Sequence, residues 1–354
     1  MAKVFEFVGK ISLGKETEKF KPIKTSKSAK GWLGTRLNFS MFNSTGYHNL
    51  EMFEGYMENG STVIYCLGKD KGADNKLPKL QIKWADRFKQ ELIDQVVGFN
   101  KFVLELGEEK REFLAGSDFL QALIEVLKNE SYKDQKFLVE GNVEYTSWNG
   151  KVYRKFVPKT VKTVPNDVPD QSIVQLDMFY GQDSLEKITD DKYVINGWVQ
   201  QYDSTLKRQV PFKEEVVIDS SKAQTEKQKR AFELITNRFM VSDESIMKLG
   251  VKTVMINGRE KVDIKLEDLT DEERELIDIG LATFEEIASE YGGSTNGDKI
   301  SEMKVIGFGR GYNKGAQKTD FTLEDFTIVD ATDEIVDTTS DVVDEVFEDD
   351  DLPF

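Results

Sequence analysis

The sequence of 354 residues has only one cysteine, Cys66, and one histidine, His48. A single cysteine excludes an internal disulfide framework and a cysteine-rich zinc site. A single histidine leaves little basis for a Ser-His-Asp triad or a polyhistidine metal site. The apolar neighbours of Cys66 predict a small buried thiol in a strand. His48 lies in Thr45-Gly46-Tyr47-His48-Asn49, which looks like a loop, and we predict a surface histidine there.

Long apolar runs are also absent, and none approaches the roughly 20 residues that cross a bilayer. The N-terminal segment alternates apolar and polar residues and has no secretory signal, so we expect a cytoplasmic protein without membrane contact. The hydrophobic fraction of 39% is sufficient for real cores. At roughly 150 residues per domain, the length predicts two domains.

Acidic charge is concentrated at the C-terminal end of the chain. The formal net charge is -16, yet residues 330–354 hold eleven Asp and Glu and no Lys or Arg. Without that segment the 48 basic residues face 53 acidic ones. Residues 1–37 have nine Lys and Arg against three Glu, and residues 148–165 have five against none. Such asymmetry indicates the kind of partner and does not specify a fold.

Short strand patterns dominate the first half. We predict strands over 4–13, 32–42, 49–56, 62–67, 79–84 and 101–106, a Lys-rich connection over 15–30, and a helix over 117–129 with Ser117 or Asp118 as its N-cap. Strands over 136–145 and 151–157 are joined by Asn149-Gly150, a strong hairpin signal. Pro158, Pro165 and Pro169 then indicate a linker.

The second half repeats the mixture of strands and helices. Strands are predicted over 172–181, 193–202, 208–219, 304–308 and 321–329, and a hairpin at Asn257-Gly258 is predicted within 253–265. Helices are predicted over 223–239, 270–280 and 284–291, with Phe232, Leu234, Ile235 and Phe239 as core contacts of the first.

The predicted fold class is therefore mostly β with inserted helices (α+β). It comprises two OB-like Greek-key barrels and a disordered acidic C-terminal tail. The expected domains are a first OB-like domain over 1–160, a Pro-rich linker over 161–171, a second OB-like domain over 172–329, and the tail over 330–354.

The tail ends in an unusual hexapeptide, Asp349, Asp350, Asp351, Leu352, Pro353 and Phe354. Apolar groups at the end of an acidic string gain nothing within the chain. They suit an anchor, with Phe354 in an apolar pocket and the aspartates steering toward a basic rim.

This hexapeptide resembles the C-terminal tip of bacterial single-stranded DNA-binding proteins. The resemblance implies recruitment of replication, recombination and repair proteins through the tip. The body is longer than in the bacterial family, and it looks more like a bacteriophage-encoded single-stranded DNA-binding protein acting in the bacterial host cell. This difference leaves the oligomeric state open.

Basic residues interleaved with aromatic ones are the body's candidate contacts for nucleic acid. Non-specific binding of unpaired strands needs cations for phosphates and flat rings for exposed bases. The candidate cations are Lys24, Lys27, Lys30, Arg36, Lys151, Arg154, Lys155 and Lys159, and the candidate stacking residues are Trp32, Trp148, Tyr153 and Trp198. Aromatic residues in a hairpin are as often core residues, and that alternative stays open. A basic-aromatic loop over 308–315 is a further candidate.

Enzymatic chemistry has little support in the sequence. Lys314 is followed by Gly315 where a phosphate-binding loop requires Ser or Thr. The acidic residues of 266–275 and 284–290 are spaced like those of solvated helix faces, so we expect neither a metal nor another cofactor. The alternatives are a replisome or recombination adaptor that docks through the tail without coating DNA, and a strand-annealing protein.

Overall fold

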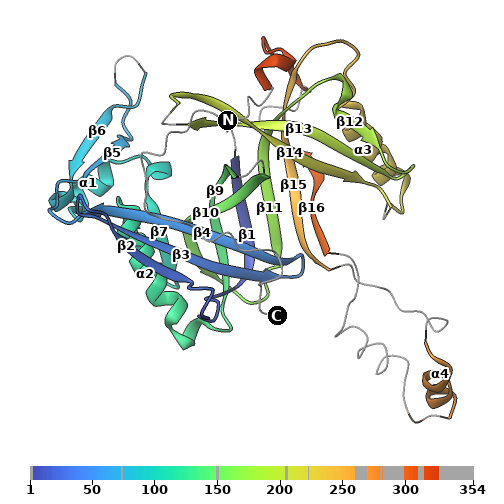
Figure 1. Cartoon of the computed structure of the whole chain (residues 1–354), viewed down its shortest axis with the longest axis horizontal. Coiled ribbons are helices and arrows are strands. Elements are labelled where there is room, and N and C mark those ends of the chain that lie inside the picture. Colours follow the sequence, from blue (N-terminus) through green and yellow to red (C-terminus); the bar gives the residue numbers. More distant parts are fainter. Residues whose placement is uncertain are drawn as a thin grey trace.

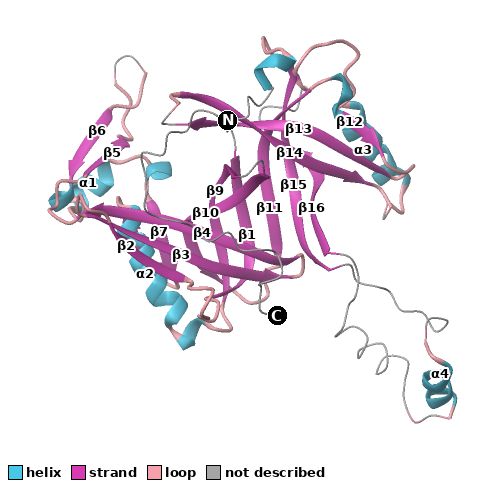
Figure 2. Cartoon of the chain, in the orientation of Figure 1, coloured by secondary structure: helices cyan, strands magenta, loops and turns pink. Residues whose placement is uncertain are grey.

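The computed structural model describes residues 3–72, 75–148, 151–203, 206–221, 223–259, 269–279, 281, 299–309 and 315–326. Within these ranges strands greatly outnumber helices, and all but two of the strands belong to one 15-stranded sheet (Figure 2). The fold is mostly β, as the sequence predicts. The terminal hexapeptide, the helix predicted over 284–291 and residues 310–314 of the basic-aromatic loop lie outside the described residues.

The described part of the first half contains ten strands and two α-helices. The strands are β1 (Lys3–Ser12), β2 (Ile23–Lys27), β3 (Trp32–Asn43), β4 (Gly46–Met57), β5 (Val63–Leu67), β6 (Lys79–Lys83), β7 (Phe102–Leu106), β8 (Glu109–Phe113), β9 (Lys136–Trp148) and β10 (Lys151–Val164). The helices are α1 (Gln90–Gln95) and α2 (Gly116–Lys128), with 3₁₀ turns at Trp84–Asp86, Gly98–Asn100 and Glu130–Tyr132.

Five of these strands pair in a closed ring, in the order β1–β3–β4–β10–β9 and back to β1. All its pairings are antiparallel except the one between β4 and β10, where Leu50 lies opposite Phe156. Numbered along the chain, the ring strands follow the order 1-2-3-5-4. Helix α2 lies between the third and fourth of them in sequence.

In the second half the described residues form seven strands and two α-helices. The strands are β11 (Gln171–Tyr180), β12 (Leu185–Lys187), β13 (Lys192–Asp203), β14 (Arg208–Asp219), β15 (Met247–Arg259), β16 (Lys299–Phe308) and β17 (Gln317–Lys318). The helices are α3 (Glu226–Asn237) and α4 (Asp271–Asp278), with 3₁₀ turns at Gln182–Ser184 and Leu323–Phe326.

A second ring has the same connectivity as the first. Its order is β11–β13–β14–β16–β15 and back to β11, again 1-2-3-5-4. The single parallel pairing again joins the third and fifth strands, where Val217 lies opposite Lys304. Helix α3 occupies the place in sequence that α2 has in the first ring. The two halves therefore repeat one topology, although their sequences show no clear repeat.

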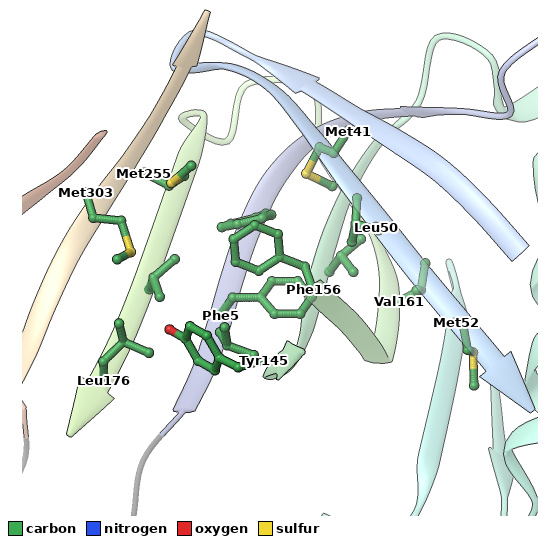
Figure 3. Packing of buried hydrophobic residues seen from close by; sticks show 14 of the residues in the cluster. Phe5, Met41, Leu50, Met52, Tyr145, Phe156, Val161, Leu176, Met255 and Met303 are labelled. Carbon is green, nitrogen blue, oxygen red and sulfur yellow. The ribbon is translucent and has the colours of Figure 1, made fainter. Parts of the chain in front are cut away.

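The first strands of the two rings, β1 and β11, pair antiparallel and join both rings into one sheet (Figure 1). Phe5 lies opposite Val174, and both side chains are buried in one core cluster that extends through both rings. Figure 3 shows Phe5, Tyr145 and Phe156 facing Met255 and Met303 of the second ring.

Buried polar groups also tie the rings together. The Arg154 guanidinium of β10 donates to the Glu214 carboxylate of β14 through Nε at 2.9 Å and Nη2 at 2.5 Å. The Tyr145 hydroxyl donates to the same carboxylate at 2.6 Å. Burial alone would lower the pKa of the Arg154 guanidinium, but the Glu214 carboxylate holds that pKa above its usual value. Burial raises the pKa of the Tyr145 hydroxyl. We call Tyr145, Arg154 and Glu214 the inter-ring cluster.

Several local predictions are wrong for identifiable reasons. Residues 161–164 of the expected linker continue β10, because Pro158 lies at a bulge and Val161 is fully buried beyond it. Asn257 and Gly258 form no hairpin, since β15 runs through them and the Asn257 side chain donates to the Tyr47 carbonyl at 2.5 Å.

Several side chains and short elements also differ from the prediction. His48 lies in β4 and is only 1% exposed, with Nε2 placed 2.8 Å from the Ser172 hydroxyl. Leu234 of α3 is exposed, whereas Phe239 is buried as predicted. Helix α2 begins one residue early, with no side-chain N-cap, and residues 323–326 form a 3₁₀ turn in place of a strand. The Lys-rich connection over 15–30 contains strand β2. Cys66 is buried in β5, as predicted.

Candidate nucleic-acid interface

The outer face of β3 and β4 presents two aromatic rings and an arginine. The Trp32 indole lies over Gly34 and Gly55, since a Cβ at either glycine would overlap it. The Phe53 ring packs edge-on against Trp32 at 5.4 Å between centroids and remains 48% exposed. The Arg36 guanidinium carbon lies 5.3 Å from the Phe53 centroid. We call Trp32, Arg36 and Phe53 the aromatic face of the first ring.

The sequence pattern explains how this face forms. Residues of even number in β3 point outward, because Leu37, Phe39 and Met41 point into the core. Trp32 can lie flat on the sheet because Gly34, two residues along β3, and its cross-strand partner Gly55 leave the backbone uncovered. The aromatic face is thus a consequence of strand alternation and of two small residues.

Three of the predicted lysines lie in β2 or in the turn that follows it, next to β3. Lys24 of β2 lies directly opposite Arg36, and residues paired in this way project to the same side of a sheet. Lys27, at the end of β2, is ion-paired to Glu58 at 2.7 Å. Lys30 is exposed in the turn between β2 and β3. The structure therefore brings together Lys24, Arg36 and Trp32, which the sequence proposes as contacts.

The tip of the β9–β10 hairpin holds a second set of candidates. Lys151 is exposed and lies opposite Trp148, and Tyr153 two residues later is 39% exposed. The side chain of Trp148 and the turn at 149–150 lie outside the described residues. The antiparallel pairing of β9 and β10 predicted from the sequence is confirmed.

The remaining basic candidates have partners within the chain. Arg154 belongs to the inter-ring cluster, and Lys155 is ion-paired to Glu51 at 2.8 Å. The Lys159 ammonium donates to the Phe99 carbonyl at 3.2 Å. Arg154 has the clearest structural role, because its carboxylate partner is almost fully buried.

Trp198 is covered by other rings. Its centroid lies 5.1 Å from that of Phe326, and both pack in a cluster with Phe179 and Ile246. The 3₁₀ turn Leu323–Phe326 therefore occupies the outer surface of the second ring around Trp198. Within the described part of the chain, the indole Nε1 of Trp198 is buried without a hydrogen-bond partner.

Phe53 is the residue that the sequence reasoning missed. It lies in a predicted strand without neighbouring lysines, so a search for basic-aromatic runs passes over it. The cross-strand register supplies the missing information, because it places Phe53 opposite Arg36. A signal in the sequence is an aromatic residue at a polar-face position of a strand with a glycine two residues away, as Phe53 has in Gly55.

In the described ranges, no three His, Cys, Asp or Glu side chains are grouped to hold a metal ion. No described helix is long and apolar enough to span a bilayer.

No family model and no curated protein matches the chain. Two solved structures of the single-stranded DNA-binding protein from Thermus aquaticus, the wild type and a deletion mutant, are similar at 12% and 11% identity. Both cover 72% of this chain, with 85% and 87% of their own chains, at a TM-score of 0.28. A TM-score of this size leaves fold and function to be argued from the strand pairing and the side chains.

Proposed function

We propose that this protein binds single-stranded DNA without sequence preference and without chemistry on it, in DNA replication, recombination and repair. The observation that supports this most is the aromatic face of the first ring. There the half-exposed Phe53 and the Trp32 indole lie beside Arg36 and Lys24. Rings next to cations are what unpaired strands require, because every base has a face to stack and every nucleotide has a phosphate.

The position of this face supports the same function. We propose that each ring is an OB-type barrel, because five strands close in the order 1-2-3-5-4 with a helix between the third and fourth. OB folds bind oligonucleotides on the face of their second and third strands and on the loops between strands 1 and 2 and strands 4 and 5. In the first ring these are the β3–β4 face, the segment holding Lys24 to Lys30, and the β9–β10 tip.

The two rings differ in what their equivalent faces offer. In the second ring, Phe326 packs on Trp198, and Tyr202 is the exposed ring of β13 at 58%. We therefore propose that the first ring provides the main binding face and that Trp198 has a structural role. Lys151 and Tyr153 at the β9–β10 tip extend the interface of the first ring.

We propose that the acidic tail recruits partner proteins through Asp349 to Phe354. The support is the sequence alone: an apolar, carboxylate-ended tip on an acidic string suits a pocket with a basic rim. Because the tip lies at the end of the acidic tail, one chain can bind DNA with its body and a partner protein with its tip. It also explains how a DNA-binding protein has a net charge of -16.

The DNA-binding proposal is tested with a fluorescent oligo-dT and anisotropy. Trp32→Ala and Phe53→Ala should each weaken binding by about 1–3 kcal/mol, the range for a stacked base. Phe99→Ala is the matched control, since Phe99 is an exposed ring, at 60%, in the turn Gly98–Asn100 outside β3 and β4. If the wild type shows no salt-sensitive binding, the proposal is wrong and the adaptor alternative gains support.

The tail proposal needs a separate experiment. A labelled peptide of residues 344–354 is titrated with purified replication and recombination proteins of a bacterial host. We expect binding that Phe354→Ala abolishes, while the same substitution in the full chain leaves oligo-dT affinity within twofold. Equal binding of the wild-type and Phe354→Ala peptides would contradict a tip-specific role.

A further inference from the structure

The β5–β6 hairpin projects from the first ring and is held as a separate small unit (Figure 1). It forms the two-stranded sheet outside the large one. One side of the hairpin is apolar: Cys66 and Ile82 are buried with Ile93, Val96 and Leu114. This second core anchors the hairpin to α1 and to the segment before α2. The hairpin is therefore fixed by packing on one side only.

The opposite side of the hairpin exposes an aromatic ring between two lysines. Tyr65 is 72% exposed and lies directly opposite Gln81. Lys79 and Lys83 lie on β6 two residues to either side of Gln81, so each is a diagonal neighbour of Tyr65 on the same face of the hairpin. Diagonal neighbours on one face lie about 7–8 Å apart, within reach of long side chains. Within the described residues, Lys79 and Lys83 form no ion pair and Tyr65 makes no ring contact.

Folding does not explain this arrangement. An aromatic side chain contributes to stability by burial, and Tyr65 gains little at this exposure. The hairpin segment 63–83 contains five lysines against two aspartates in a chain whose net charge is -16. A positively charged hairpin with an exposed aromatic ring suits a partner that has both negative charges and planar groups that can stack.

The hairpin begins where the aromatic face ends. Met57, the last residue of β4, lies opposite Trp32 and donates its backbone N–H to the Thr62 hydroxyl at 2.8 Å. Thr62 directly precedes β5, and its carbonyl accepts from the Trp84 backbone N–H at 3.1 Å. Trp84 stacks on Tyr56 at 4.8 Å between ring centroids. The base of the hairpin is thus packed against the end of β4 that holds Trp32.

We infer that the outer side of the β5–β6 hairpin is a further contact for the bound DNA strand, beyond the OB-type face. One unpaired base stacks on Tyr65, and the adjacent phosphates bind Lys79 and Lys83. The strand reaches the hairpin from Trp32 across the end of β4. This inference rests on the proposed function, because it extends the path of the same strand.

The test uses the full chain and a fluorescent dT oligonucleotide of about 20 residues. Tyr65→Ala should lower affinity about fivefold or more, the lower end of the effect for one stacked base, and Tyr65→Phe should retain it. The Lys79→Gln/Lys83→Gln double variant should reduce the slope of log K against log salt by about 1.4, since each phosphate contact on single strands contributes about 0.7. Lys133→Gln is the matched control, because the Lys133 side chain is 76% exposed on a different part of the ring.

A second measurement does not depend on the variants. Oligo-dT with 5-iododeoxyuridine at single positions is photocrosslinked to the wild-type chain, and we expect Tyr65 in a crosslinked peptide. If Trp32→Ala weakens binding while Tyr65→Ala and the lysine pair change nothing and Tyr65 never crosslinks, the hairpin contact is refuted and the proposed function stands. If the wild type binds no oligonucleotide, both fall.

Discussion

Removing the Glu214 carboxylate should destabilise the junction between the two rings more than any change at the neighbouring surface. The Glu214 side chain is 4% exposed and accepts hydrogen bonds from Arg154 and Tyr145. Glu214→Ala leaves the Arg154 charge largely buried without its partner. Breaking a buried pair in this way costs about 3–5 kcal/mol. Because Arg154 retains 22% exposure, we expect the lower end of that range.

The assay is urea unfolding followed by tryptophan fluorescence, with Glu215→Ala as the matched control. Glu215 is the next residue in β14 and points to solvent, so its loss should change stability by less than about 0.5 kcal/mol. The double variant Arg154→Met/Glu214→Leu removes both charges and should recover most of the stability. Glu214→Ala within about 0.5 kcal/mol of the control would refute the reasoning.

The double variant also decides the role of Arg154. Because the Arg154 guanidinium is bound to the Glu214 carboxylate, we expect that Arg154 does not contact phosphate. The salt dependence of oligo-dT binding should therefore be the same in the double variant and the wild type. A slope smaller by about 0.7 would identify Arg154 as a phosphate contact after all.

Burial lowers the pKa of His48 from 6.5 to about 4, so the unfolded chain takes up its proton first as the pH falls, and about 3 kcal/mol of stability should be lost between pH 6.5 and 4. The NMR signal of this only imidazole should titrate near pH 4, and a midpoint near 6.5 would contradict its burial. Gly34→Ala should displace the Trp32 indole and weaken oligo-dT binding by about 1 kcal/mol with little loss of stability, as compared by anisotropy and urea unfolding. Phe326→Ala should cost about 3–5 kcal/mol in urea unfolding, since Phe326 is 2% exposed among three rings, and a cost under 1 kcal/mol would count against this packing.

The positions of most strands follow from the sequence because alternation of apolar and polar residues is a local signal. β3, β9, β13 and β14 all lie where that pattern places them. Long-range pairing carries no such signal. Asn257-Gly258 reads as a turn, and only its contacts with the start of β4 explain why the strand continues.

The site could be predicted in part for the same reason. Trp32 and Arg36 are adjacent to a lysine-rich segment, which makes them visible in the sequence. Phe53 becomes their neighbour only through the register of β3 and β4. Arg154 lies in a basic segment, yet its partner is a carboxylate 60 residues away in the chain, which no local pattern indicates.

The central claim is that an unpaired strand stacks on the aromatic face of the first ring. Its most direct test is the intrinsic tryptophan fluorescence of the full chain during titration with oligo-dT, in the wild type and in Trp32→Phe. Stacking predicts saturable quenching in the wild type that is clearly smaller in Trp32→Phe, since the Phe ring still binds but no longer reports. Fluorescence that stays unchanged at saturating oligonucleotide, or quenching that is equal in both chains, would contradict it.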